Sequence, residues 1–150
     1  MNNFMDEEIH FKETKLESFN DEEIRKYLSS INLGDADYFI AVQTPSTWKY
    51  MLFGIFSMLS DSKTYFVVFN NKKVYLLEQS MMSRKSIINY YTIPWDNIKK
   101  IDCKSVMFNQ FKLNVHTDEK KYIFQVARKV YKMSNQEDVV QKFFDMKTSR

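Results

Sequence analysis

The chain has 150 residues and a formal net charge of +3, with 44% hydrophobic and 27% charged residues. Such a length and composition indicate a globular protein with a sizeable core. The two glycines, Gly34 and Gly54, cannot form a glycine-rich phosphate-binding loop. The single cysteine, Cys103, excludes an intrachain disulfide and a cysteine-based zinc finger. We therefore expect no cofactor and no metal site.

Charge and hydropathy along the chain predict a cytoplasmic protein. Residues 1–8 are acidic and polar, whereas a secretory signal starts with positive charge and continues into an apolar stretch. The longest apolar stretch, residues 48–59, has 12 residues, and a membrane-spanning helix needs about 20. Residues 1–36 carry nine acidic and four basic side chains, a net charge of −5, and residues 37–150 carry ten and eighteen, a net charge of +8. This asymmetry predicts two differently charged surfaces.

The first predicted element in chain order is a helix. Residues 1–18 show no clear period and fit either a frayed helix or an extended arm. Residues 20–33 are predicted to be helical, because apolar residues recur at helical spacing. Asn20 is placed to cap the first turn, and Gly34 lies where a left-handed C-terminal cap is expected.

The rest of the chain reads as a run of strands closed by a helix. Strands are predicted over residues 37–43, 63–69, 73–78, 86–91, 100–106, 111–117 and 122–127. Residues 93–98 interrupt the run, because Pro94 cannot donate to a strand ladder. Ser134 and Glu137 form a capping box before an apolar helical stripe that reaches Met146. This order predicts an α+β fold, mainly β, with a curved antiparallel sheet.

Short motifs in this run resemble a bacterial pleckstrin-homology-like (PH-like) domain. The resemblance is carried by the hairpin of residues 63–78, by the Ile-Pro-aromatic-Asp-x-Ile motif at residues 93–98, by the strand pair of residues 111–126 and by the final helix. Lys73 takes the place of the basic residue that precedes an apolar strand in that family.

The resemblance spans residues 37–147 and implies a seven-stranded, partly open antiparallel barrel capped by the C-terminal helix. It divides the chain into an N-terminal helical extension, residues 1–36, and a barrel domain, residues 37–150. Members of the family mostly bind lipid headgroups, proteins or further copies of themselves, so the resemblance implies binding and not catalysis.

The basic pairs nearest to the family's ligand-binding loop are candidate contacts to an anionic ligand: Lys72, Lys73, Arg84 and Lys85. The interleaved basic pattern of phosphoinositide-binding members is not found there. The sequence also lacks the aromatic and glycine spacing of RNA-recognition domains, so we do not expect a nucleic-acid partner.

No catalytic residues are predicted. His10 and His116 have neither metal-ligand spacing nor a nucleophile motif nearby, and His116 is expected at the surface. Cys103 alternates in phase with Ile101, so its thiol is expected to point inward as a small apolar group.

The apolar segment 48–59 has three interpretations: it fills the core, it packs against a second copy of the chain, or it lies in a membrane interface. The residues of a candidate interface are Trp48, Met51, Phe53 and Phe56. Together with the resemblance, this predicts a noncatalytic adaptor that binds a protein partner or another copy of itself. The alternative is a peripheral module that binds anionic lipid through segment 48–59 and nearby basic residues.

Overall fold

The computed structural model of the chain describes residues 11, 13–43, 63–83, 85–106, 109–130, 133 and 136–149. These residues form one eight-stranded sheet, two α-helices and a short 3₁₀ helix. The elements are β1 (Thr14–Lys15), α2 (Asp21–Ser30), β2 (Asp37–Gln43), β3 (Lys63–Phe69), β4 (Lys73–Gln79), β5 (Ser86–Pro94), η1 (Trp95–Asn97), β6 (Ile98–Val106), β7 (Gln110–Thr117), β8 (Lys121–Ala127) and α5 (Gln136–Thr148). The predicted class, α+β and mainly β with a C-terminal helix, is confirmed.

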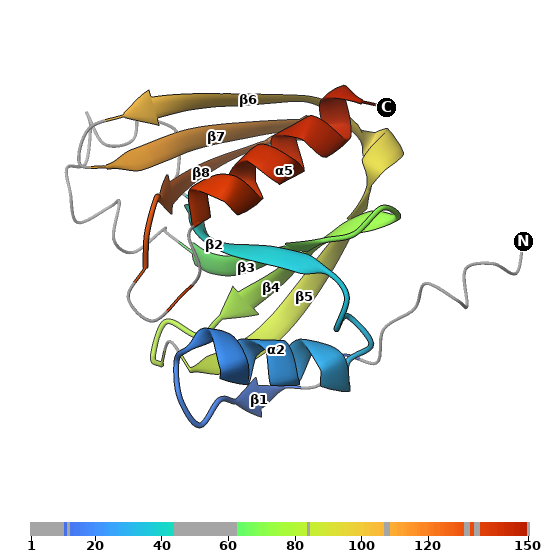
Figure 1. Cartoon of the computed structure of the whole chain (residues 1–150). Coiled ribbons are helices and arrows are strands. Elements are labelled where there is room, and N and C mark those ends of the chain that lie inside the picture. Colours follow the sequence, from blue (N-terminus) through green and yellow to red (C-terminus); the bar gives the residue numbers. More distant parts are fainter. Residues whose placement is uncertain are drawn as a thin grey trace, which may run out of the picture.

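The sheet is antiparallel throughout and curls without closing. Its strand order is β1-β5-β4-β3-β2-β8-β7-β6. Among the described residues the two end strands, β1 and β6, do not pair with each other (Figure 1). The two halves of the sheet meet at β2, which pairs with β3 along its whole length but with β8 only at Val42 and Gln43. This is the partly open arrangement expected from the sequence.

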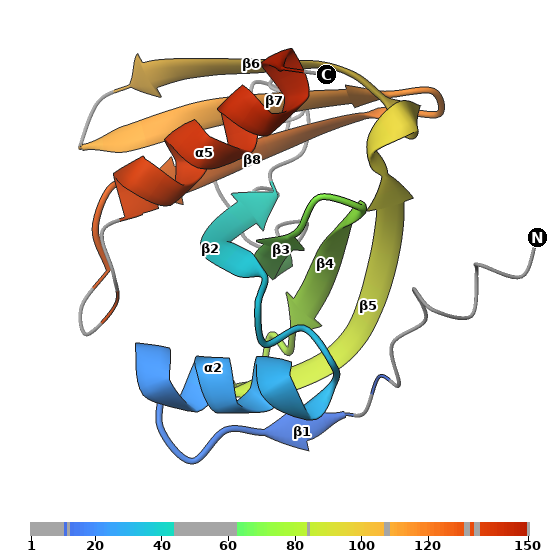
Figure 2. The same cartoon turned by 45° about the vertical axis from the view of Figure 1, so that its right-hand side comes forward.

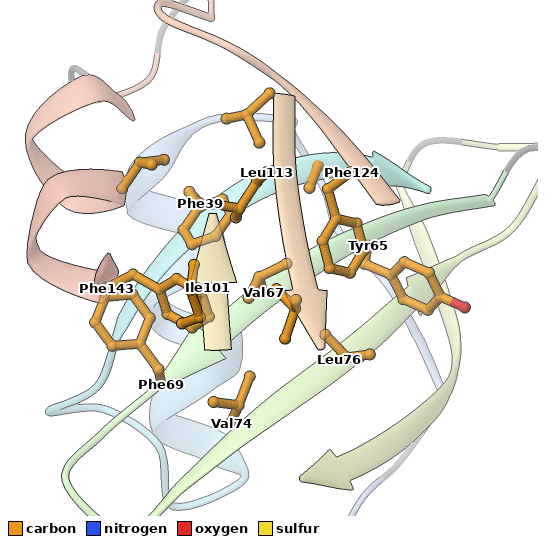
Figure 3. Close-up of a cluster of buried hydrophobic side chains, with 14 of the residues drawn as sticks. Phe39, Tyr65, Val67, Phe69, Val74, Leu76, Ile101, Leu113, Phe124 and Phe143 are labelled. Atoms are coloured by element: carbon orange, nitrogen blue, oxygen red, sulfur yellow. The ribbon is translucent and has the colours of Figure 1, made fainter. Parts of the chain in front are cut away.

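The main core lies between the two halves of the sheet and α5. Its side chains come from alternate positions of the strands, as Figure 3 shows for Phe39, Val67, Leu76 and Leu113. Phe143 projects from α5 into this cluster, and its ring centroid lies 5.4 Å from that of Phe39. Figure 2 shows α5 running along β7 and β8, and its apolar stripe, with Val140 and Phe143, packs into the core as expected.

A second core lies on the opposite face of β2–β5 and is covered by α2. The helix begins after Asn20, whose Oδ1 accepts a hydrogen bond from the Glu23 N–H at 2.9 Å, as predicted. Its apolar face packs on the sheet face that carries Tyr38, Phe66 and Leu77. Strands β2–β4 are therefore buried on both faces, whereas β7 and β8 are buried on one.

The end of α2 corrects the prediction of a cap at Gly34. The left-handed residue is Asn32, with φ 66°. The N–H of Asn32 donates to Ser29 O at 3.2 Å, and that of Leu33 donates to Leu28 O at 2.8 Å. This pair of bonds is a Schellman motif, and asparagine supplies the positive φ because its short polar side chain tolerates it.

The boundary after β5 also differs from the prediction. The strand runs through Ile93 to Pro94, which pairs in register with Lys73, and the interruption begins at Trp95. Proline is tolerated there because no described strand pairs with the other side of β5 at this point, so no ladder needs its missing N–H. Of the two predictions for residues 1–18, a frayed helix or an extended arm, the extended conformation is found at Thr14–Lys15. The predicted capping residue of the last helix, Ser134, lies outside the described residues.

One buried side chain holds the two halves of the sheet and α5 together. Beyond Val42 and Gln43, β2 and β8 separate, and the Gln136 amide fills the space between them. Its Oε1 accepts from the Ile40 N–H at 2.6 Å, and its Nε2 donates to Ala127 O at 2.7 Å and Ile40 O at 3.3 Å. Gln136 is 4% exposed.

We predict that Gln136→Leu lowers the free energy of unfolding by about 3 kcal/mol, because it leaves two buried backbone groups of Ile40 and the part-buried Ala127 O unsatisfied. Urea unfolding followed by circular dichroism measures the effect. Gln141→Ala, at an exposed glutamine further along α5, should change the stability by less than about 0.5 kcal/mol. A Gln136→Leu variant as stable as the parent would contradict this role.

Candidate functional site

The basic residues singled out in the sequence do not form one site. Lys72 and Lys73 lie at the β3–β4 turn, and Lys85 lies just before β5, at the other end of β4. The seven residues of β4 separate them by roughly 20 Å. Lys85 Nζ donates to Glu17 O at 3.4 Å, and Arg84 lies outside the described residues.

The apolar segment 48–59, with Trp48, Met51, Phe53 and Phe56, also lies outside the described residues. Its three interpretations stay predictions. The strand ends that flank it are paired, Gln43 of β2 with Lys63 of β3.

The two end strands of the sheet differ in how their outer edges are covered. At one end β1 pairs with the start of β5 at Ser86 and Ile87. The Phe11 ring then stacks on Tyr90, with 5.0 Å between the ring centroids. At the other end β6 pairs with β7 on one side, and no described strand pairs with its other side. An edge strand of nine residues is thus left with unpaired backbone groups.

A groove of about 230 Å³ lies beside this free edge. Its strand wall is formed by Cys103–Ser105 of β6, and its helix wall includes Val140, Gln141 and Phe144 of α5. Phe111 of β7 contributes to the lining, so the groove combines an apolar surface with the unpaired edge of β6.

Arg128 contacts three residues that line the groove, Phe111, Ser105 and Glu137. Its guanidinium carbon lies 4.1 Å from the centroid of the Phe111 ring. Its Nη2 donates to Ser105 Oγ at 2.6 Å, and its Nη1 lies 2.9 Å from Glu137 Oε2. One side chain thereby links the last part of β6, the start of β7 and the first turn of α5.

Cys103 lies on the inward face predicted for it, where it lines the groove with Phe111 and Val140, but it is not covered as an apolar core group would be. It shares the phase of Ile101, which is buried, yet Cys103 itself is exposed. Across from Cys103 the side chains of α5 leave the groove open, so the thiol is not covered by the helix. Partial burial raises the pKa of the Cys103 thiol and Arg128 lowers it in part, with a net rise. This environment does not favour the reactive thiolate.

The outer face of β6, β7 and β8 carries a concentration of lysines. Strand register places Lys104 directly opposite Lys112, and it places His116 between Lys100 and Lys121. We call these four lysines, Lys100, Lys104, Lys112 and Lys121, the basic face. Lys104, Lys112 and Lys121 make no ion pair within the described part of the chain.

The Asp102 carboxylate on the basic face is already engaged. Its Oδ2 lies 3.1 Å from His116 Nε2, and its Oδ1 lies 3.5 Å from Lys100 Nζ. His116 is thus half-buried on the polar side of its strand, in contact with Asp102. The basic face was not evident in the sequence, because it depends on the register between strands.

Within the described ranges, no group of three or more His, Cys, Asp or Glu side chains is placed to hold a metal ion. Neither α2 nor α5, the two α-helices of those ranges, is long and apolar enough to cross a membrane.

Comparisons with known proteins give a distant structural likeness. No family model matches the chain, and no curated protein matches it. Among solved structures, the hSac2 domain from human phosphoinositide phosphatase Sac2 aligns with a TM-score of 0.46 and 13% sequence identity, covering 87% of this chain and 82% of that chain.

We predict that Lys112→Glu raises the free energy of unfolding by about 0.5 kcal/mol, because it converts a like-charge pair with Lys104 into an opposite-charge pair. Urea unfolding at low salt measures the gain, which should shrink in high salt. Lys72→Glu, in an exposed turn, is the control and should lack the gain. Equal stability of the Lys112→Glu variant and the parent at low salt would argue against repulsion at this pair.

Proposed function

We propose that the protein is a noncatalytic cytoplasmic binding module that takes an extended segment of a partner protein as an additional strand on β6. The observation that carries the proposal is the free β6 edge lying beside a groove in which apolar side chains of α5 and β7 alternate with polar ones. Backbone groups of an edge strand bind an incoming strand through main-chain hydrogen bonds, and pockets beside the edge select its side chains.

The groove defines the kind of segment that fits. Val140, Phe144 and Phe111 offer apolar contact to every second side chain of an added strand. The added strand can come from a different protein or can be the β6 strand of a second copy, since either can supply an extended segment to this edge. The contrast with β5, whose edge is partly covered by β1 and Phe11, supports β6 as the binding edge.

The test uses linear peptides selected from a random displayed library on the whole chain. We expect Gln141→Trp, which places a large side chain in the groove, to weaken binding of the selected peptides at least about tenfold. Bound peptide should also slow hydrogen exchange of backbone amides between Cys103 and Val106. Fluorescence anisotropy measures the affinity.

The matched control is Asp138→Trp, at an exposed α5 position outside the groove, which should bind the peptides as the parent does. Peptides that bind the Gln141→Trp variant unchanged, or that leave β6 exchange unaltered, would rule out this groove. Light scattering separates the two kinds of partner, because self-pairing through β6 doubles the mass in the absence of peptide.

The basic face supports a second candidate function, docking on an anionic lipid surface. Lysines near an anionic membrane each contribute about 1 kcal/mol of attraction. The four lysines are spread over one face of three strands, and the described residues add no arginine and no enclosing pocket there. Such a group suits the many phosphates of a lipid surface better than a single small ligand.

Vesicle co-sedimentation tests this candidate, with phosphatidylcholine alone and with added phosphatidylserine. The double variant Lys104→Glu, Lys112→Glu should lower binding to the anionic vesicles at least about tenfold. Lys72→Glu combined with Lys73→Glu is the comparison. If the Lys72→Glu, Lys73→Glu variant loses more vesicle binding, the lipid contact lies at the β3–β4 turn and not at the basic face. If the parent protein binds neither kind of vesicle at low salt, docking on a lipid surface is ruled out.

A further inference from the structure

A second hollow, of about 290 Å³, lies between β5 and the turn that joins β7 to β8. We call it the tyrosine slot. Tyr91 of β5 and Tyr122 of β8 line it, and Asn97, Glu119 and Lys120 lie around its rim. It is separate from the groove beside β6, with which it shares no residue.

Further aromatic rings lie behind the two slot tyrosines. The Tyr65 ring centroid lies 6.4 Å from that of Tyr91 and 6.2 Å from that of Phe124, edge-to-face in both pairs. Phe124 stacks on Tyr122, with 5.8 Å between the centroids. In Figure 3 the Tyr65 hydroxyl points away from the buried cluster. The aromatic surface of the slot is therefore fixed by packing.

The turn at the rim is held in place by hydrogen bonds. Thr117 Oγ1 donates to Lys120 O at 2.7 Å and accepts from the Lys120 N–H at 3.1 Å. The N–H of Asp118 donates to Asn97 O at 3.1 Å, which ties the turn to η1. The slot is thus formed before any ligand arrives.

Among the residues that the structure describes, carboxylates outnumber free cations around the slot. Glu78 Oε1 accepts from the Tyr91 hydroxyl at 3.4 Å, and Asp118 is paired with Lys99 at 3.2 Å. Within the described part of the chain, Glu78 and Glu119 have no ion pair. Burial, and after it the Glu119 carboxylate, raises the pKa of the Tyr122 hydroxyl, so that ring stays neutral.

One face of the slot already accepts a cation. The Lys120 ammonium lies 4.4 Å from the centroid of the Tyr122 ring. A cation over a tyrosine face is attracted by the negative face of the ring, and a poorly hydrated cation gains most. Lys120 therefore competes with any positively charged ligand for this position.

We propose that the tyrosine slot binds an organic cation of the alkylated ammonium class. Methyl groups on nitrogen contact the Tyr91 and Tyr122 rings, Glu119 on the rim balances the charge, and Glu78 adds negative charge beside the Tyr91 hydroxyl. The same carboxylates oppose an anion. The proposal does not depend on the binding function of β6.

The probe is choline, compared with its neutral isostere in which carbon replaces nitrogen. Chemical shifts of the Tyr91, Asn97 and Lys120 amides report binding in the whole chain. We expect choline to bind at least about tenfold more tightly than the isostere. Tyr122→Leu should weaken choline binding by a similar factor.

Lys120→Ala gives the sharper result, since Lys120 is exposed and its removal leaves the core intact. Removal of the competing ammonium should tighten choline binding several-fold. Tyr90→Leu, which alters the ring stacked on Phe11, is the control and should bind choline unchanged. Equal binding of the isostere, weaker binding by the Lys120→Ala variant, or no shift at the slot residues would each overturn the proposal.

Discussion

The way the two halves of the sheet and α5 fit together depends on the Gln136 amide. Where β2 and β8 separate, their backbone groups would be buried without partners, and this one side chain satisfies three of them. Because Gln136 is also the first residue of α5, the same bonds fix where the helix starts. The position of Phe143 in the core, and that of the groove along β6, follow from that starting point.

A curled sheet that stays open has two edges, and the chain treats them differently. The β5 edge is partly covered by a two-residue strand and by an aromatic contact, whereas the β6 edge meets α5 across a groove. The polar features are divided in the same way. Lysines lie on the outer face of the β6–β8 half, and tyrosines with carboxylates lie at the gap next to β5.

The local sequence pattern predicted the strands well. Strands buried on both faces appear as continuous apolar runs, as in residues 63–69 and 73–78. Strands buried on one face show apolar and polar residues in alternation, as β7 does. The sites could not be predicted in this way. Lys104 meets Lys112 through strand register, and Tyr91 meets Tyr122 through the curl of the sheet. Cys103 shows what alternation along a strand cannot predict. Alternation indicates the face of the sheet on which a side chain lies, but not whether the helix packed on that face covers it.

The unequal covering of the two edges limits how copies of the chain can assemble. Growth of a fibre needs two exposed edges in each copy, one to accept a neighbour and one to offer to the next. β1 covers β5 only at Ser86 and Ile87, so it shortens the second edge without removing it, and two copies that paired through β6 alone would form a closed, two-fold symmetric pair. A strand of only two residues therefore reduces the length of backbone that another copy could pair with at this end of the sheet.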